Sequence, residues 1–106
     1  MADSFSERRK GYEAKWAHDE DLRFKVMNRR NKLLGLWAAG EVGKTGAAAE
    51  DYAKSVIIAD MAEKGDEDVF RKVRADLPAA IADATIRGKM DELLVTAHDQ
   101  VTTEKK

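Results

Sequence analysis

The stretch RRNKLLGLWAA, residues 29–39, decides the fold class, because its apolar residues recur at the spacing of an α-helix. Leu34 and Ala38 fall one turn apart on one face, and Asn31 falls on the same face. An amide on an apolar face predicts a buried hydrogen bond that fixes the register of the helix. Extended in both directions, the same period predicts a helix over residues 21–39.

Three more helices are predicted toward the C-terminus, over residues 47–64, 66–77 and 85–101. Pro78 ends the second of these, because proline has no backbone donor and disfavours helical geometry at the residue before it. No strand pattern competes with the helical ones. Short connections between four helices predict an all-α protein built as a four-helix antiparallel bundle.

The bundle is expected to bury the apolar faces of its four helices. The residues predicted to be largely buried are Phe24, Met27, Leu34, Trp37, Tyr52, Val56, Ile57, Val69, Phe70, Val73, Ile86, Met90, Leu93 and Leu94.

Composition narrows the class of protein. The chain has 106 residues, enough for one domain, with 37% charged residues and a net charge of −1. A nearly neutral chain argues against nucleic-acid binding, which depends on neutralising phosphates. There is no cysteine, and we find no apolar stretch of the length of a signal core or a membrane span. We therefore expect a cytoplasmic protein with no nucleic-acid partner and no direct membrane insertion.

Residues 1–19 differ from the predicted bundle, residues 20–106, in their dense, mixed charge and few large apolar side chains. Wound as a helix, Phe5, Tyr12 and Trp16 lie roughly along one stripe. Two interpretations stay open. The segment extends the first helix, with Trp16 packed on the bundle, or it is flexible and presents aromatic anchors to a groove in a partner protein.

The run Gly43-Lys44-Thr45 resembles the end of a phosphate-binding loop. The full motif needs a glycine where this chain has Ala38, and it follows a strand, whereas here a helix precedes. We interpret the run as a helix stop followed by an N-cap, and no cofactor is predicted.

No other cluster supports catalysis or metal binding. The run His18-Asp19-Glu20-Asp21 could be imagined as metal ligands, but neighbouring residues on a helix point in different directions, so an acidic helix start is expected. Arg29, Arg30 and Lys32 are expected to pair with carboxylates on neighbouring helices. Since no nucleophile–base or paired-carboxylate arrangement has local support, we expect no enzyme.

Three long stretches resemble one known family. They are EAKWAHD (residues 13–19), RRNKLLGLWAA (residues 29–39) and EDVFRKVRADL (residues 67–77). In this order they are similar to the zeta subunit of the alphaproteobacterial F-type ATP synthase, a family of small ATPase inhibitors. The resemblance covers nearly the whole chain.

The resemblance implies a four-helix bundle that carries an N-terminal inhibitory segment. It implies that the segment enters the interface between the alpha and beta subunits of the catalytic head, near the gamma subunit, and blocks rotation in the hydrolysis direction. The partners would be these three subunits, at the cytoplasmic face of the ATP synthase, and the free chain would be a monomer.

On this chain the inhibitory role would fall on residues 2–19. Aromatic and arginine side chains are the residue types that dominate interfaces. The expected partner-binding residues are Phe5, Arg8, Arg9, Tyr12, Glu13, Lys15, Trp16 and His18. Gly11 departs from the family pattern and lowers helix propensity by about 1 kcal/mol relative to alanine.

An alternative function of another class is a small nucleotide- or ligand-responsive helical binding module whose N-terminus is purely structural. The state of the segment distinguishes the two. A free, aromatic-bearing segment favours the inhibitor, and a docked one favours the binding module.

Overall fold

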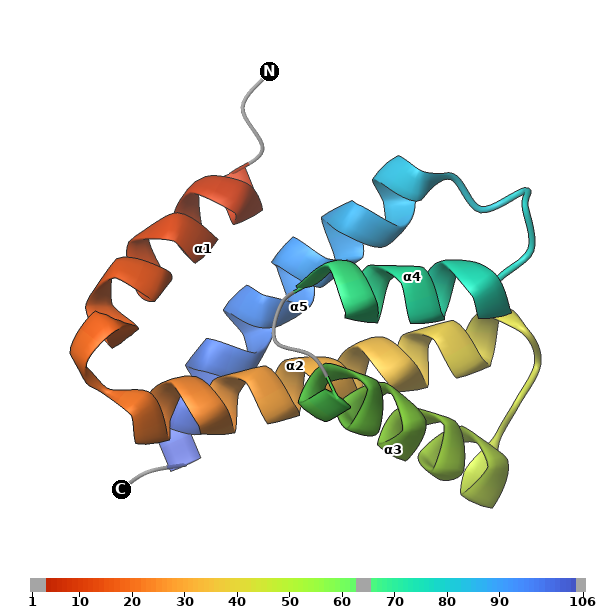
Figure 1. The fold of residues 1–106 in the computed structure, drawn as a ribbon, viewed down its shortest axis with the longest axis horizontal. Helices are drawn as coiled ribbons and strands as arrows, with labels where there is room; N and C mark the ends of the chain where they lie inside the picture. Colours follow the sequence, from red (N-terminus) through yellow and green to blue (C-terminus); the bar gives the residue numbers. More distant parts are fainter. Residues whose placement is uncertain (1–3, 63–65, 105–106) are drawn as a thin grey trace.

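Helices account for almost all of the described part of this computed structural model, residues 4–62 and 66–104 (Figure 1). In chain order they are α1 (Ser4–Lys15), the short 3₁₀ helix η1 (Trp16–His18), α2 (Glu20–Glu41), α3 (Gly46–Ala62), α4 (Asp66–Asp76) and α5 (Asp83–Glu104). These residues contain no strand, which confirms the predicted all-α class.

Helix α2 lies at the centre of the fold and packs against both α3 and α5 (Figure 1). Helix α4 packs against α3 and α5, and α1 packs against α5. The four predicted helices correspond to α2–α5, with ends shifted by at most three residues where they can be compared. The predicted end of the second helix near residue 64 lies outside the described residues. Helix α1 is a fifth helix that the predicted bundle did not contain.

Asp19 separates α1 and η1 from α2. Its side chain accepts a hydrogen bond from the Leu22 backbone N–H (3.0 Å), and its backbone N–H donates to the Trp16 carbonyl (2.9 Å). Its φ of −131° and ψ of 83° are not helical, so the chain turns there. An aspartate followed by Glu20 and Asp21 is a favourable start for α2. The N-terminal segment therefore does not extend α2, and of that interpretation only the packing of Trp16 is observed.

The other helix ends follow from glycine and proline. Helix α4 ends at Asp76, two residues before Pro78, as predicted. After α2, Gly43 has a φ of +80°, and the Lys44 backbone N–H donates to the Ala39 carbonyl (2.8 Å). This geometry closes a helix C-terminus and suits a residue without a Cβ.

Two apolar clusters form the core. The larger one joins α2, α3, α4 and α5 and contains Leu34, Ala38, Val56, Val69, Val73, Leu77, Ile86 and Met90. The smaller one joins η1, α2 and the C-terminal half of α5 and contains Trp16, Val26, Leu94, Ala97 and Val101.

The predicted core is largely confirmed. Leu34, Val56, Val69, Val73, Ile86, Met90 and Leu94 are buried. The residues that are partly buried and pack against the two clusters are Met27, Trp37, Tyr52, Phe70 and Leu93.

Two core predictions need correction. Ile57 is only partly buried, and Phe24 is 60% exposed. Val26, not Phe24, is the buried residue in this turn of α2. Since residues two apart on a helix point about 200° apart, burial of Val26 turns Phe24 toward solvent.

Gly35 allows α2 and α3 to approach each other closely. A Cβ placed on Gly35 would lie 2.5 Å from the Cα of Ala53 and 3.1 Å from its Cβ. Backbone atoms of α3 cannot move aside as a flexible side chain could, so a methyl group at this position would push the two helices apart.

Gly35→Ala is expected to lower the free energy of unfolding by about 1–3 kcal/mol, in spite of alanine's better helix propensity, because overpacking strains the α2–α3 contact. Gly88→Ala is the matched control, since nothing lies within 4 Å of a Cβ at Gly88 in α5. The control is expected to gain up to about 1 kcal/mol. Chemical denaturation of both variants measures the difference, and a stabilised Gly35→Ala would contradict the close approach.

Candidate functional site

The outer edge of the α1–α5 contact is a chain of polar and aromatic interactions. Arg8 Nη2 donates to the Tyr12 hydroxyl oxygen (3.2 Å), and that hydroxyl donates to Asp99 Oδ1 (3.2 Å). The Tyr12 ring stacks on His98, with 3.7 Å between ring centroids. The hydrogen bond to Tyr12 raises the pKa of the Arg8 guanidinium, so Arg8 keeps its charge. This edge of α1 is held mainly through Tyr12.

Arg9 joins α1 to two other helices. Its Nη1 donates to Asp91 Oδ1 on α5 (2.9 Å), and its Nη2 forms an ion pair with Asp66 at the start of α4. Its Nε lies 3.4 Å from Glu13 Oε2, one turn along α1. The Arg9 side chain is only 15% exposed, so these pairs are partly shielded from water.

Asp66 is shared with a buried arginine of α2. Arg30 and Asn31 are fully buried, and Arg30 donates from Nη2 to Asp66 Oδ1 (3.1 Å) and from Nε to Asn31 Oδ1 (2.7 Å). Asn31 Nδ2 donates in turn to Asp60 Oδ2 (2.8 Å), which confirms the buried hydrogen bond predicted at Asn31. Burial, followed by repulsion from Arg9, lowers the pKa of Arg30 to about 10. Arg30 therefore remains charged at neutral pH.

Trp16 is part of the core. It is 1% exposed and packs in the smaller cluster with Val26 and Leu94. Its ring lies 5.6 Å from that of His98, centroid to centroid. In this conformation Trp16 cannot reach a partner protein.

The expected partner-binding residues fall into two sets. Arg9, Tyr12 and Trp16 lie between α1 or η1 and α5, and Phe5 is partly buried. The residues exposed to solvent are Arg8, Glu13, Lys15 and His18. The structure thus brings Arg8, Arg9, Tyr12 and Trp16 together against α5, with Glu13 paired to Arg9 at the side of this contact.

The residues that receive α1 were not found from the sequence. They are Asp66 at the start of α4, and Asp91, His98 and Asp99 on α5. His98 follows Asp91 by seven residues, so these two share a helix face, and Asp99 is the next residue after His98. This spacing could have indicated a polar face on α5, but it does not reveal that α1 packs on that face.

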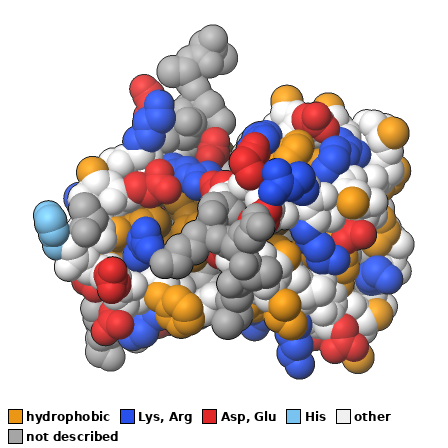
Figure 2. Space-filling view, viewed as in Figure 1, with side chains coloured by type: hydrophobic (Ala, Val, Ile, Leu, Met, Phe, Trp, Pro, Cys, Tyr) orange, Lys and Arg blue, Asp and Glu red, His pale blue; other side chains and the backbone are white. Residues whose placement is uncertain are grey.

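The basic run of α2 pairs with carboxylates, as predicted, at two of its three positions. Arg29 Nη2 lies 2.7 Å from Glu104 Oε1, and Arg30 pairs with Asp66. Lys32 makes no ion pair with any described residue. Figure 2 shows basic and acidic side chains interspersed over the face drawn, in keeping with the many ion pairs of this surface.

The described residues contain no group of three histidine or carboxylate side chains placed to hold a metal ion. The run Gly43-Lys44-Thr45 lies in the exposed turn between α2 and α3, after a helix, where a phosphate-binding loop would follow a strand. Within residues 4–62 and 66–104, no helix combines the length and the hydropathy needed to cross a membrane.

One family model matches residues 1–100 of the chain and is described as ATPase inhibitor subunit zeta. The chain belongs to this family. The resemblance read from the three long stretches is thereby confirmed. Membership assigns the chain to the regulators of ATP synthase, and it supports an inhibitory role, not a catalytic one.

A solved structure supports the fold of this chain. It is described as a solution NMR structure, is 44% identical, and superposes with a TM-score of 0.73. The match covers 78% of this chain and 98% of that one. A search of curated proteins gave no match.

Proposed function

We propose that the chain inhibits ATP hydrolysis by the F-type ATP synthase, with residues 1–19 as the inhibitory segment and residues 20–106 as the body that carries it. In this proposal α1 enters the interface between the alpha and beta subunits of the catalytic head, near the gamma subunit, and blocks rotation in the hydrolysis direction. Family membership supports the inhibitory role. The observation that supports assigning it to the N-terminus is that α1 is a separate helix on the surface of α5.

The contacts of α1 support its release. The ion pair between Arg8 and Asp99 is half exposed, and such pairs contribute about 0–1 kcal/mol each. Helix α2 has its own cap at Asp19, so it does not depend on α1 for a complete N-terminus. Arg9 is more shielded, at 15% exposed, so release of α1 must also break its pairs with Asp66 and Asp91. A helix on the surface is expected to open more readily than the core.

In this structure α1 is docked, which is the arrangement that the ligand-responsive alternative predicts. The family assignment favours the inhibitor. A docked α1 is compatible with inhibition if the helix cannot bind α5 and the catalytic head at the same time. Arg9 and Tyr12 are engaged by α5, so α1 must leave α5 before these side chains can bind a partner. Because Trp16 is nearly fully buried, the part that moves is proposed to end at Lys15.

Arg8→Ala is expected to weaken inhibition about tenfold or more, since an arginine in the centre of an interface commonly contributes 2 kcal/mol or more. The Arg8 side chain is 49% exposed, so its loss should leave the fold intact. The measurement is ATP hydrolysis by the purified catalytic head at increasing inhibitor concentration. Arg71→Ala is the matched control, because Arg71 is also exposed and also pairs with one aspartate, Asp68. It is expected to inhibit as the natural chain does.

A chain lacking residues 2–15 tests the segment as a whole and keeps Trp16 in the core. It is expected to fold and to have lost inhibition. Equal inhibition by the shortened and the full chain would contradict a role for α1. Absence of inhibition by either would favour the ligand-responsive binding module.

A further inference from the structure

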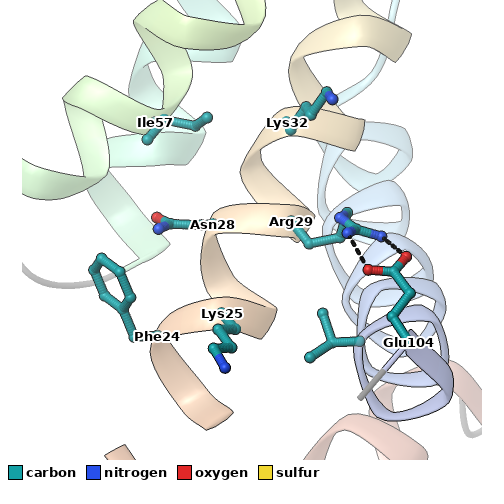
Figure 3. Close-up of a pocket in the computed structure, with 8 residues that line it drawn as sticks. Phe24, Lys25, Asn28, Arg29, Lys32, Ile57 and Glu104 are labelled. Atoms are coloured by element: carbon teal, nitrogen blue, oxygen red, sulfur yellow. Dashed lines mark hydrogen bonds and ion pairs between the residues drawn. The ribbon is translucent and has the colours of Figure 1, made fainter. Parts of the chain in front are cut away.

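Phe24 lies in an open groove on α2 that the contacts of α1 do not involve. It is 60% exposed, and Ile57 of α3 lines the wall of the same groove (Figure 3). Asn28 lies between them on the same side of α2, and its side chain forms no hydrogen bond with a described residue. An exposed aromatic ring and an aliphatic side chain on either side of an amide without a hydrogen-bond partner are typical of a recognition surface.

The charges of the groove are mainly positive. Lys25 and Lys32 line it, are exposed, and form no ion pair within the described part of the chain. Arg29 also lines it but donates two hydrogen bonds to Glu104 (2.8 and 2.7 Å), which closes the wall on the α5 side. The chain as a whole has a net charge of −1, so this excess of positive charge is local.

The spacing of these side chains fits a helix. Phe24, Asn28 and Lys32 recur every four residues along α2, and this face extends over roughly two turns, or about 12 Å. Grooves between packed helices commonly receive an amphipathic helix, whose anchors recur at i, i+3, i+4 and i+7.

We infer that the α2 groove, formed by Phe24, Lys25, Asn28, Lys32 and Ile57, docks an acidic amphipathic helix of a partner protein. Apolar side chains of that helix pack on Phe24 and Ile57, and its carboxylates pair with Lys25 and Lys32. The chain's own N-terminal segment is not the occupant, because its run Arg8-Arg9-Lys10 has the same sign of charge as the groove. The inference is independent of the proposed function, since Asp66, Asp91, His98 and Asp99, which hold α1, do not line the groove.

The test uses the full chain, labelled with ¹⁵N, and a synthetic amphipathic helix with leucine at i, i+3, i+4 and i+7 and glutamate beside the leucines. We expect saturable amide shifts centred on Phe24, Asn28 and Ile57. The double variant Lys25→Glu/Lys32→Glu is expected to weaken binding about tenfold or more, and Phe24→Ala to weaken it as well. The matched control is Lys44→Glu/Lys54→Glu, which makes the same change of net charge at exposed positions outside the groove. It should bind the peptide with little change.

Several results would overturn the inference. One is equal binding of a peptide with lysine in place of glutamate, which would show that charge does not matter. Another is the same shifts, at equal affinity, with inorganic triphosphate, which would indicate a site for small anions. Shifts at the groove that depend on the concentration of the chain alone would indicate a second copy as the occupant. Peptide shifts centred outside the groove would also contradict it.

Discussion

Trp16→Ala is expected to lower the free energy of unfolding by about 3–5 kcal/mol, the range for truncating a large buried aromatic side chain. The ring is 1% exposed and packs with Val26, Leu94, Ala97 and Val101, so its loss would leave a cavity where η1, α2 and α5 meet. Chemical denaturation monitored by circular dichroism measures the change. Any loss of inhibition in this variant would therefore mix a defect in the fold with a defect in binding.

Phe24→Ala is the control for Trp16→Ala. Both residues are aromatic. The sequence predicted Phe24 in the core and left Trp16 either packed on the bundle or bound to a partner, but Phe24 is 60% exposed. Its truncation should change the free energy of unfolding by no more than about 0.5 kcal/mol. If the two variants lost the same stability, the burial of Trp16 described above would be wrong.

Asp66→Asn is expected to lower the free energy of unfolding by about 3 kcal/mol or more, because it removes a counter-charge from a fully buried guanidinium. Arg30 cannot give up its proton at neutral pH, and in the variant it would face a neutral amide. The same substitution removes the ion pair between Arg9 and α4. Thermal unfolding at neutral pH is the measurement.

Asp68→Asn is the matched control, because Asp68 is also in the first turn of α4 and also pairs with an arginine. Its partner Arg71 is 65% exposed, so the expected loss is within about 1 kcal/mol. Similar losses in the two variants would mean that burial of Arg30 has little energetic effect.

The helices were predictable because their signals are local. Pro78, the acidic start of α4 and the apolar period of α5 each act within a few residues, and the structure has helices at these places. The error at Phe24 arose because the buried stripe of α2 runs through Val26, Arg30 and Leu34. An arginine counts as polar in any hydrophobic pattern, so the pattern was continued from Leu34 toward the N-terminus through Met27 and Phe24 instead of Arg30 and Val26.

The candidate site was less predictable because it depends on contacts between distant residues. Arg9 and Tyr12 were identified as functional residues, but the sequence does not reveal that Asp91 and His98 receive them, 82 and 86 positions further on. The break between α1 and α2 did have a local signal, namely Asp19 followed by two acidic residues. The predicted boundary between residues 1–19 and the bundle falls at this signal, but the sequence left open whether the segment continues the first helix.

Asp66 connects α1 electrostatically to the interior of the protein, because its two oxygens hold two different arginines. Asp66 Oδ2 pairs with Arg9 and Oδ1 pairs with Arg30, and the charge of Arg9 is, after burial, the main cause that lowers the pKa of Arg30. If α1 leaves α5, as proposed, Arg30 loses this repulsion together with the carboxylate of Glu13, which acts in the opposite direction. The position of a surface helix is thus sensed by a buried charge on α2, so release of α1 would be expected to change the electrostatic environment of Arg30 as well as the exposure of Arg9.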